Sequence, residues 1–252
     1  MSPIKLIGFD LDDCLFDSTG LSERARIKGL DAMINLGLKI NKKKAKQILR
    51  EIVEEYGSNF SEHYNILIRR LNQVDENIEY IRYNDFYKYV AAAVMAYHEE
   101  KVSSIRLYDD VEYNLKRIKE LSIKIAIITD GIPIKQYEKI LRLKIDKLID
   151  LIVISDEIGI KKPNPELFNY CLKKFGVKGQ ETIYVGDRID KDIIPANANK
   201  IFSVYLHRGG KYDNYKADFK LQGDFKPKYE IYSLKELFDI INEINNKRKV
   251  IK

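Results

Sequence analysis

The chain has 252 residues, of which 44 are Lys or Arg and 38 are Asp or Glu, and its formal net charge is +6. This length allows one large domain or two modest ones with a sizeable core. A hydrophobic share of 45% excludes overall disorder. No segment approaches the roughly 18 consecutive apolar residues of a membrane span, and the N-terminus lacks the apolar region of a signal peptide. Two cysteines cannot form a disulfide framework. We therefore expect a soluble, cytoplasmic protein without a membrane partner.

The positive charge is spread along the chain. Its densest run, Asn41 to Lys46, is short and is typical of a solvated helix start. A nucleic-acid-binding protein would need a clustered basic face, so we do not expect nucleic acid as a partner. An excess of positive charge suits small anionic substrates such as phosphate esters.

The first predicted element is a short, buried strand, Ile4 to Phe9, followed by an acidic loop. From about Ser18 to Lys101 the pattern is helical and contains no proline, which predicts a bundle of four or five helices. This helical insert begins just after the loop of the first strand. In open α/β sheets, ligands bind at that edge of the sheet.

Strands and helices alternate after residue 107. The pattern predicts helices at 110–121, after Pro133, after Pro165 and at 190–199, and strands at 123–128, 151–154, 182–185 and 201–206. A capping box, Ser233 to Glu236, starts a C-terminal helix. We expect an α/β fold: a Rossmann-like, doubly wound parallel sheet as the core (1–16 and 106–252), with an inserted α-helical bundle (17–105).

Polar side chains follow four of the predicted strands. They are Asp10, Asp12 and Asp13; Thr129 and Asp130; Lys161 and Lys162; and Asp187, Asp190 and Asp192. In a parallel sheet these strand ends lie on one side, so carboxylates, a hydroxyl and an ammonium should converge there.

Such a cluster has a specific chemistry. Crowded carboxylates repel one another unless a cation lies among them, and hard oxygen ligands favour Mg²⁺. A metal, an ammonium and a hydroxyl together suit a phosphoryl group. One carboxylate can then attack phosphorus to form an aspartyl-phosphate, and a second, two residues on, can give a proton to the leaving oxygen.

Four motifs resemble those of the haloacid dehalogenase-like hydrolases. They read Asp10-Leu-Asp12-Asp13-Cys14, Thr129-Asp130-Gly131, Lys162-Pro163-Asn164-Pro165 and Gly186-Asp187-Arg-Ile-Asp190-Lys-Asp192-Ile193, in the family's order. The resemblance covers the whole chain. The insert after the first motif resembles the helical C1 cap of subfamily I, and the chain looks most like archaeal phosphatases that carry such a cap.

The resemblance implies a role for each matching residue. Asp10 would be the nucleophile and Asp12 the general acid/base, and Thr129 and the amide of Asp130 would hold the phosphoryl oxygens. Lys162 would neutralise charge on the nucleophile and the phosphoryl group. Asp10, the backbone carbonyl of Asp12 and Asp187 would bind Mg²⁺. Asp192, with Asp190 as the second choice, would support the metal's waters or Lys162.

One position departs from the family pattern. Cys14 stands where the family has Thr or Val. A cysteine is small and tolerates burial, so it can fill this space, although it lacks the threonine hydroxyl.

These patterns predict a Mg²⁺-dependent phosphatase for a small phosphorylated metabolite, acting as a monomer or homodimer. Three alternatives stay open. A 2-haloacid dehalogenase shares the fold, but it needs no metal and lacks the second aspartate. A phosphomutase also uses an aspartyl-phosphate. A receiver-type signalling domain uses Asp, Thr and Lys around Mg²⁺, but its acceptor Asp follows a later strand and it needs no helical insert.

Overall fold

A computed structural model describes residues 3–74, 83–210, 213 and 223–250. The contacts between residues divide the chain into two compact units. One unit is Met1–Thr19 together with Arg106–Lys252, and the other is Gly20–Ile105. Both ends of the second unit therefore connect to the first. Within the described ranges, no helix is long and apolar enough to cross a membrane.

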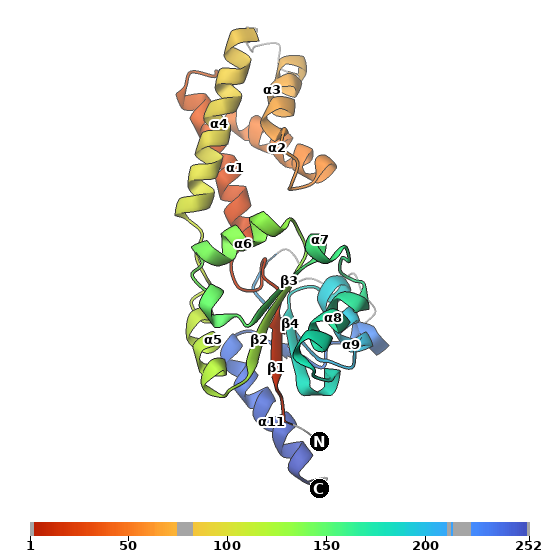
Figure 1. Ribbon diagram of the computed structural model, residues 1–252. Coiled ribbons are helices and arrows are strands. Elements are labelled where there is room, and N and C mark those ends of the chain that lie inside the picture. The colour runs from red at the N-terminus through yellow and green to blue at the C-terminus, as the bar shows by residue number, and fades with distance from the viewer. Residues whose placement is uncertain (1–2, 75–82, 211–212, 214–222, 251–252) are drawn as a thin grey trace. The chain divides into compact units, whose positions relative to one another are not determined.

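The first unit contains a parallel sheet of six strands (Figure 1). Their order is β3 (Leu151–Ile154), β2 (Lys124–Thr129), β1 (Leu6–Phe9), β4 (Thr182–Gly186), β5 (Phe202–Leu206) and β6 (Tyr229–Ile231). All neighbouring strands run parallel, and every residue of β1 and β4 is buried. The predicted α/β fold is confirmed. β6 was not predicted, because three residues with one buried side chain give too short a pattern.

Helices cover both faces of the sheet, as its apolar strands require. In Figure 1, α5 (Val111–Glu120) and α11 (Leu237–Val250) lie on one side, and α8 (Pro165–Phe175) and α9 (Ile194–Ala198) lie on the other. On the α8 side, Phe168 packs edge-on against Tyr184 of β4 with ring centroids 4.7 Å apart. α6 (Pro133–Arg142) and the short α7 (Ser155–Ile158) follow the carboxyl ends of β2 and β3.

Short helical turns complete this unit. They are the 3₁₀ turns Asp146–Leu148, Gly179–Glu181, Gly223–Phe225 and Leu234–Glu236, and the π-helical turn Ile189–Ile193. The predicted helix at 190–199 is thus a π turn followed by the five-residue α9. Pro195 lacks the amide hydrogen that a continuous α-helix would need at that position, and the chain takes a wide turn before it. The predicted helix starts at Pro133 and Pro165 and the capping box at Ser233 are observed.

The second unit is helical. Four helices lie in its described part: α1 (Ser18–Asn35), which begins just before this unit, α2 (Lys42–Tyr56), α3 (His63–Val74) and α4 (Tyr83–Ser103). Asn41 caps α2, its side chain accepting from the amide of Lys44 at 3.1 Å. A core of its own includes Leu30, Leu49, Leu67 and Leu71.

Candidate active site

Asp10 lies at the carboxyl end of β1, at the centre of the sheet. Its backbone amide donates to the carbonyl of Val185 in β4 at 2.9 Å. This bond extends the β1–β4 ladder by one residue and holds Asp10 beside the end of β4. The neighbouring strand therefore positions Asp10 directly, as the strand-end pattern predicted.

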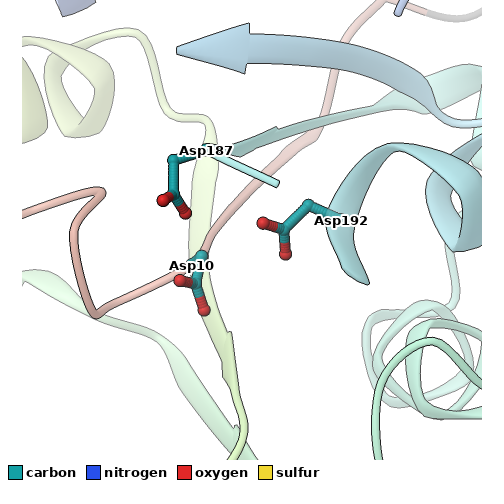
Figure 2. A group of neighbouring side chains, drawn as sticks. All are labelled: Asp10, Asp187 and Asp192. Atoms are coloured by element: carbon teal, nitrogen blue, oxygen red, sulfur yellow. The ribbon is translucent and has the colours of Figure 1, made fainter. Parts of the chain in front are cut away.

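Asp187 and Asp192 lie next to Asp10. Asp187 follows β4, and Asp192 lies on the π-helical turn after it. Figure 2 shows the three side chains grouped together, and one carboxylate oxygen from each lies within 4.8 Å of the others. Gly186 makes this approach possible, because a Cβ at that position would collide with the Asp192 carboxyl group. Three acidic groups from two strand ends and one turn thus surround one small space.

Lys162 supplies the positive charge of the cluster. Its Nζ donates to Asp10 Oδ1 at 2.7 Å, to Asp192 Oδ1 at 2.7 Å and to the hydroxyl of Tyr184 at 2.8 Å. Three N–H groups therefore meet three acceptors. The side chain of Lys162 is only 2% exposed, so its charge is held in a site from which most water is excluded.

The remaining oxygens distinguish Asp192 from Asp187. Asp192 Oδ2 accepts from the amide of Arg188 at 3.1 Å, so both oxygens of Asp192 are engaged. Asp187 Oδ1, by contrast, is buried and has no hydrogen-bond partner among the described residues. A buried polar atom without a partner is costly unless a ligand or ion satisfies it. Asp187 is thus the carboxylate best placed to accept a cation.

Burial and mutual repulsion set the titration of these groups. Burial raises the pKa of Asp10 to about 7, opposed by Lys162 and reinforced by Asp192. Burial and the carboxyls of Asp192 and Asp10 raise the pKa of Asp187 well above its usual range. Burial alone would lower the pKa of Lys162, but Asp10 and Asp192 outweigh it and raise that pKa. One ammonium leaves the acidic cluster short of positive charge.

A divalent cation fits this arrangement. The unpartnered oxygen of Asp187, the raised carboxyl pKa values and the grouping of oxygen donors all point to a missing positive charge. Oxygen-only donors are typical of Mg²⁺ and other hard cations. Two of the predicted metal ligands, Asp10 and Asp187, belong to this group of carboxylates. The third predicted ligand is the backbone carbonyl of Asp12, so it is not a carboxylate of the group.

Thr129 ends β2, the strand on the other side of β1 from β4, and Asp130 follows it. Thr129 is 1% exposed, and its hydroxyl accepts from Gln136 Nε2 at 2.7 Å. The Asp130 carboxylate accepts from the amide of Lys162 at 3.0 Å and from Lys191 Nζ at 2.7 Å. Through these two contacts, Asp130 links the segment that follows β3 to the segment that follows β4.

Asp12 lies in the loop after β1, where it pairs with Phe16 in a β-bridge. Lys139 Nζ contacts both of its carboxylate oxygens at 2.8 Å, and Gln136 Nε2 lies 3.2 Å from Oδ2. Burial would raise the pKa of Asp12, but Lys139 and hydrogen bonds from other side chains together outweigh burial, and the pKa is lowered. The sequence prediction missed Gln136 and Lys139. The one available signal was that Gln136 shares the buried face of its helix with Ile140, four residues on.

Asp190 lies apart from the acidic group. Its carboxylate pairs with the side chain of Arg188 at 3.0 and 2.5 Å, and 39% of its side chain is exposed. Of the two predicted supporting residues, Asp192 is thus the one that contacts Lys162. Cys14 is fully buried, and its thiol lies 3.7 Å from the carbonyl of Val185. Burial and the nearby Asp10 raise the pKa of this thiol, which keeps it protonated.

The chain is similar to a known family of proteins. A family model described as haloacid dehalogenase-like hydrolase matches residues 4–199. The chain is 39% identical to glyceraldehyde 3-phosphate phosphatase of Methanopyrus kandleri over 243 residues, which are 96% of this chain and 98% of the relative. It is also 39% identical to the Pyrococcus furiosus protein of the same name over 251 residues, covering 100% of this chain and 98% of the relative.

Solved structures share the fold. A putative beta-phosphoglucomutase from Thermotoga maritima superimposes with a TM-score of 0.67 at 16% identity, covering 95% of this chain and 99% of that one. At this identity the likeness shows the arrangement of strands and helices alone.

Proposed function

We propose that this chain, which belongs to the haloacid dehalogenase-like hydrolase family, is a Mg²⁺-dependent phosphatase of small phosphate monoesters. The observation that carries the proposal is that a buried site for a cation lies close to a buried positive charge. Asp187 offers an unpartnered oxygen to a cation, and Lys162 offers an ammonium beside Asp10. A dianionic phosphate with its metal is the ligand that such a pair of sites accepts.

Asp10 is the proposed nucleophile. A carboxylate oxygen attacks phosphorus, a bond forms between them, and the bond from phosphorus to the leaving oxygen breaks. Lys162 lies 2.7 Å from Asp10, so its charge favours the ionised form of this carboxylate and offsets charge on the phosphoryl group. Asp192 and Tyr184 hold the Lys162 ammonium in this position.

Asp12 is the proposed general acid/base. In its protonated form it gives a proton to the leaving oxygen as the aspartyl-phosphate forms, and the resulting carboxylate then takes a proton from the water that attacks phosphorus. The second attack breaks the bond to Asp10 and releases inorganic phosphate. Thr129 and the amide of Asp130 are proposed to hold the phosphoryl oxygens. Asp10, Asp187 and the carbonyl of Asp12 would hold Mg²⁺, which, when bound, neutralises phosphoryl charge.

The proposed substrate is a small phosphorylated metabolite such as glyceraldehyde 3-phosphate. The names of the relatives from Methanopyrus and Pyrococcus support this choice, together with alignments that cover nearly the whole chain. We further propose a cytoplasmic enzyme that acts as a monomer or homodimer, without a nucleic-acid or membrane partner.

A phosphate-release screen over many metabolites, with and without Mg²⁺, tests the proposal. Glyceraldehyde 3-phosphate and other short phosphate esters should release phosphate only with the metal, and Asp10→Asn prepared in the same way should be inactive. No release from any ester would refute the proposed function. Chloride release from 2-chloropropionate in the presence of a chelator would favour the dehalogenase alternative.

A further inference from the structure

The inner face of α6 carries two polar side chains that reach the loop after β1. Gln136 and Lys139 are three residues apart, so they project from the same side of the helix. Lys139 Nζ contacts both carboxylate oxygens of Asp12 at 2.8 Å, and Gln136 Nε2 lies 3.2 Å from one of them. Asp12 is thus held from a helix 124 to 127 residues further along the chain.

Gln136 is itself firmly held. It is only 2% exposed, and its amide also donates to Thr129 Oγ1 at 2.7 Å and to the carbonyl of Asp130 at 2.9 Å. A buried amide with several acceptors cannot rotate without leaving polar groups unsatisfied. Gln136 therefore fixes the position of the Asp12 carboxylate relative to the carboxyl end of β2.

The opposite face of α6 has a different character. Ile134, Tyr137 and Leu141 are 81%, 40% and 59% exposed. The polar side chains that reach Asp12 are therefore confined to one face. The Lys139–Asp12 pair is also partly exposed, at 22% and 31% of the two side chains, and such pairs add little to folding stability. Folding stability alone therefore does not explain why Lys139 pairs with Asp12.

We propose that Gln136 and Lys139 are positioning residues that hold the Asp12 carboxyl group for proton transfer to the leaving oxygen. The inference rests on the proposed function, in which Asp12 is the general acid/base. A proton donor acts only within hydrogen-bond reach of its acceptor. An aspartate side chain without a partner rotates about two bonds, so the loss of Lys139 lowers the fraction of molecules in which Asp12 is in place.

The test is the dependence of kcat/KM on the leaving group in Lys139→Met. The first substrate is the alkyl phosphate with the highest kcat/KM in the metabolite screen, and its leaving oxygen needs a proton. The second is p-nitrophenyl phosphate, whose leaving group departs with little help. We expect Lys139→Met to lower kcat/KM about 10- to 100-fold for the alkyl phosphate and only a few-fold for p-nitrophenyl phosphate. Lys135→Met is the matched control, an exposed lysine on the same helix, and should change neither value.

A second comparison separates positioning from a structural effect. In an Asp12→Asn background, Lys139→Met should cause no further loss, because the group that it positions is already gone. Equal losses on both substrates, or a further loss in the Asp12→Asn background, would overturn the inference. Lys139→Gln replaces Lys139→Met if circular dichroism shows that the latter is unfolded. A wild type without any phosphatase activity would refute the proposed function as well, whereas an active, Asp12-dependent wild type with an indifferent Lys139 would refute this inference alone.

Discussion

Lys162 and Asp10 lie 152 positions apart in the chain, yet the ammonium of one donates to the carboxylate of the other at 2.7 Å. The contact is almost closed to solvent, since the two side chains are 2% and 13% exposed. A buried charge pair is stable only when its remaining hydrogen-bonding groups are also satisfied. Tyr184 and Asp192 satisfy the other two N–H groups of Lys162.

The first prediction concerns Lys162. Lys162→Met should lower kcat about 10²- to 10³-fold, because the phosphoryl charge and the acidic cluster lose their neutralising ammonium. Lys161→Met is the control, since this neighbouring lysine is 69% exposed and pairs with Asp156 at 3.1 Å. Steady-state kinetics on both variants tests the difference. Similar rates for the two would show that the buried ammonium has no part in catalysis.

Asp187 should make the stability of the metal-free protein depend on pH. Its pKa is raised in the folded state, so the folded chain binds a proton more tightly than the unfolded chain does. This stabilisation is present below the unfolded pKa of about 4 and is lost as pH rises. From about pH 4 to pH 7, wild type should therefore lose stability relative to Asp187→Asn, which thermal melts in EDTA can measure.

Mg²⁺ should reverse this effect. The metal binds ionised carboxylates, so it should raise Tm more at neutral pH than at about pH 4.5. Asp187→Asn should lose most of that rise, because its amide contributes no charge. An equal rise of Tm in wild type and variant would place the cation elsewhere.

Gly186 gives a prediction about geometry. A Cβ at Gly186 would collide with the Asp192 carboxyl group, so Gly186→Ala should displace Asp192 and with it Lys162. We expect a loss of about 1–3 kcal/mol in stability and a clear drop in kcat. The control is Gly210→Ala, because nothing lies within 4 Å of the Cβ there. Unchanged kinetics in Gly186→Ala would mean that Asp192 is not needed at this position.

The strand ends could be predicted because apolar strands followed abruptly by polar residues are a local pattern. Parallel pairing then brings Asp10, Thr129 and Asp187 to one edge whatever the loops do. Lys162 was predicted in the same way, from its place after the third core strand. These predictions needed only the order and the direction of the strands.

The contacts of Asp12 could not be predicted in the same way. The ammonium of Lys139 reaches Asp12 only in the folded chain, because the two residues are 127 positions apart and their contact depends on tertiary packing. The choice between Asp190 and Asp192 also depended on geometry, since the π-helical turn brings Asp192 to Lys162 while Asp190 pairs with Arg188. The hydroxyl of Tyr184 was missed because a tyrosine in a buried strand is typical of core packing.

Cys14 yields a prediction of a small effect. Its thiol is buried against the carbonyl of Val185 at 3.7 Å, and a threonine hydroxyl could donate to the same acceptor. Cys14→Thr should therefore change kcat/KM only a few-fold and stability by about 1 kcal/mol. Kinetics and thermal melts measure both quantities. An inactive variant, or wild type switched off by peroxide and restored by thiol, would reveal a role for this cysteine.

The last prediction concerns the helical unit Gly20–Ile105, which is inserted directly after the loop that carries Asp12. We predict that this unit selects the substrate by size. An active site from which water is excluded during phosphoryl transfer has room only for a small leaving group. Every phosphate ester shares the phosphoryl group, so discrimination must come from residues outside the sheet edge. The wild type should therefore prefer triose phosphates to a phosphopeptide.

Replacing this unit with a short Gly/Ser linker tests the prediction. Both units have a core of their own, and circular dichroism should confirm that the shortened chain is folded. Activity on the best small substrate should fall far more than activity on p-nitrophenyl phosphate, whose leaving group needs less help from Asp12. Equal losses on the two substrates would exclude the helical unit as the specificity element, and so would efficient hydrolysis of a phosphopeptide by the intact chain.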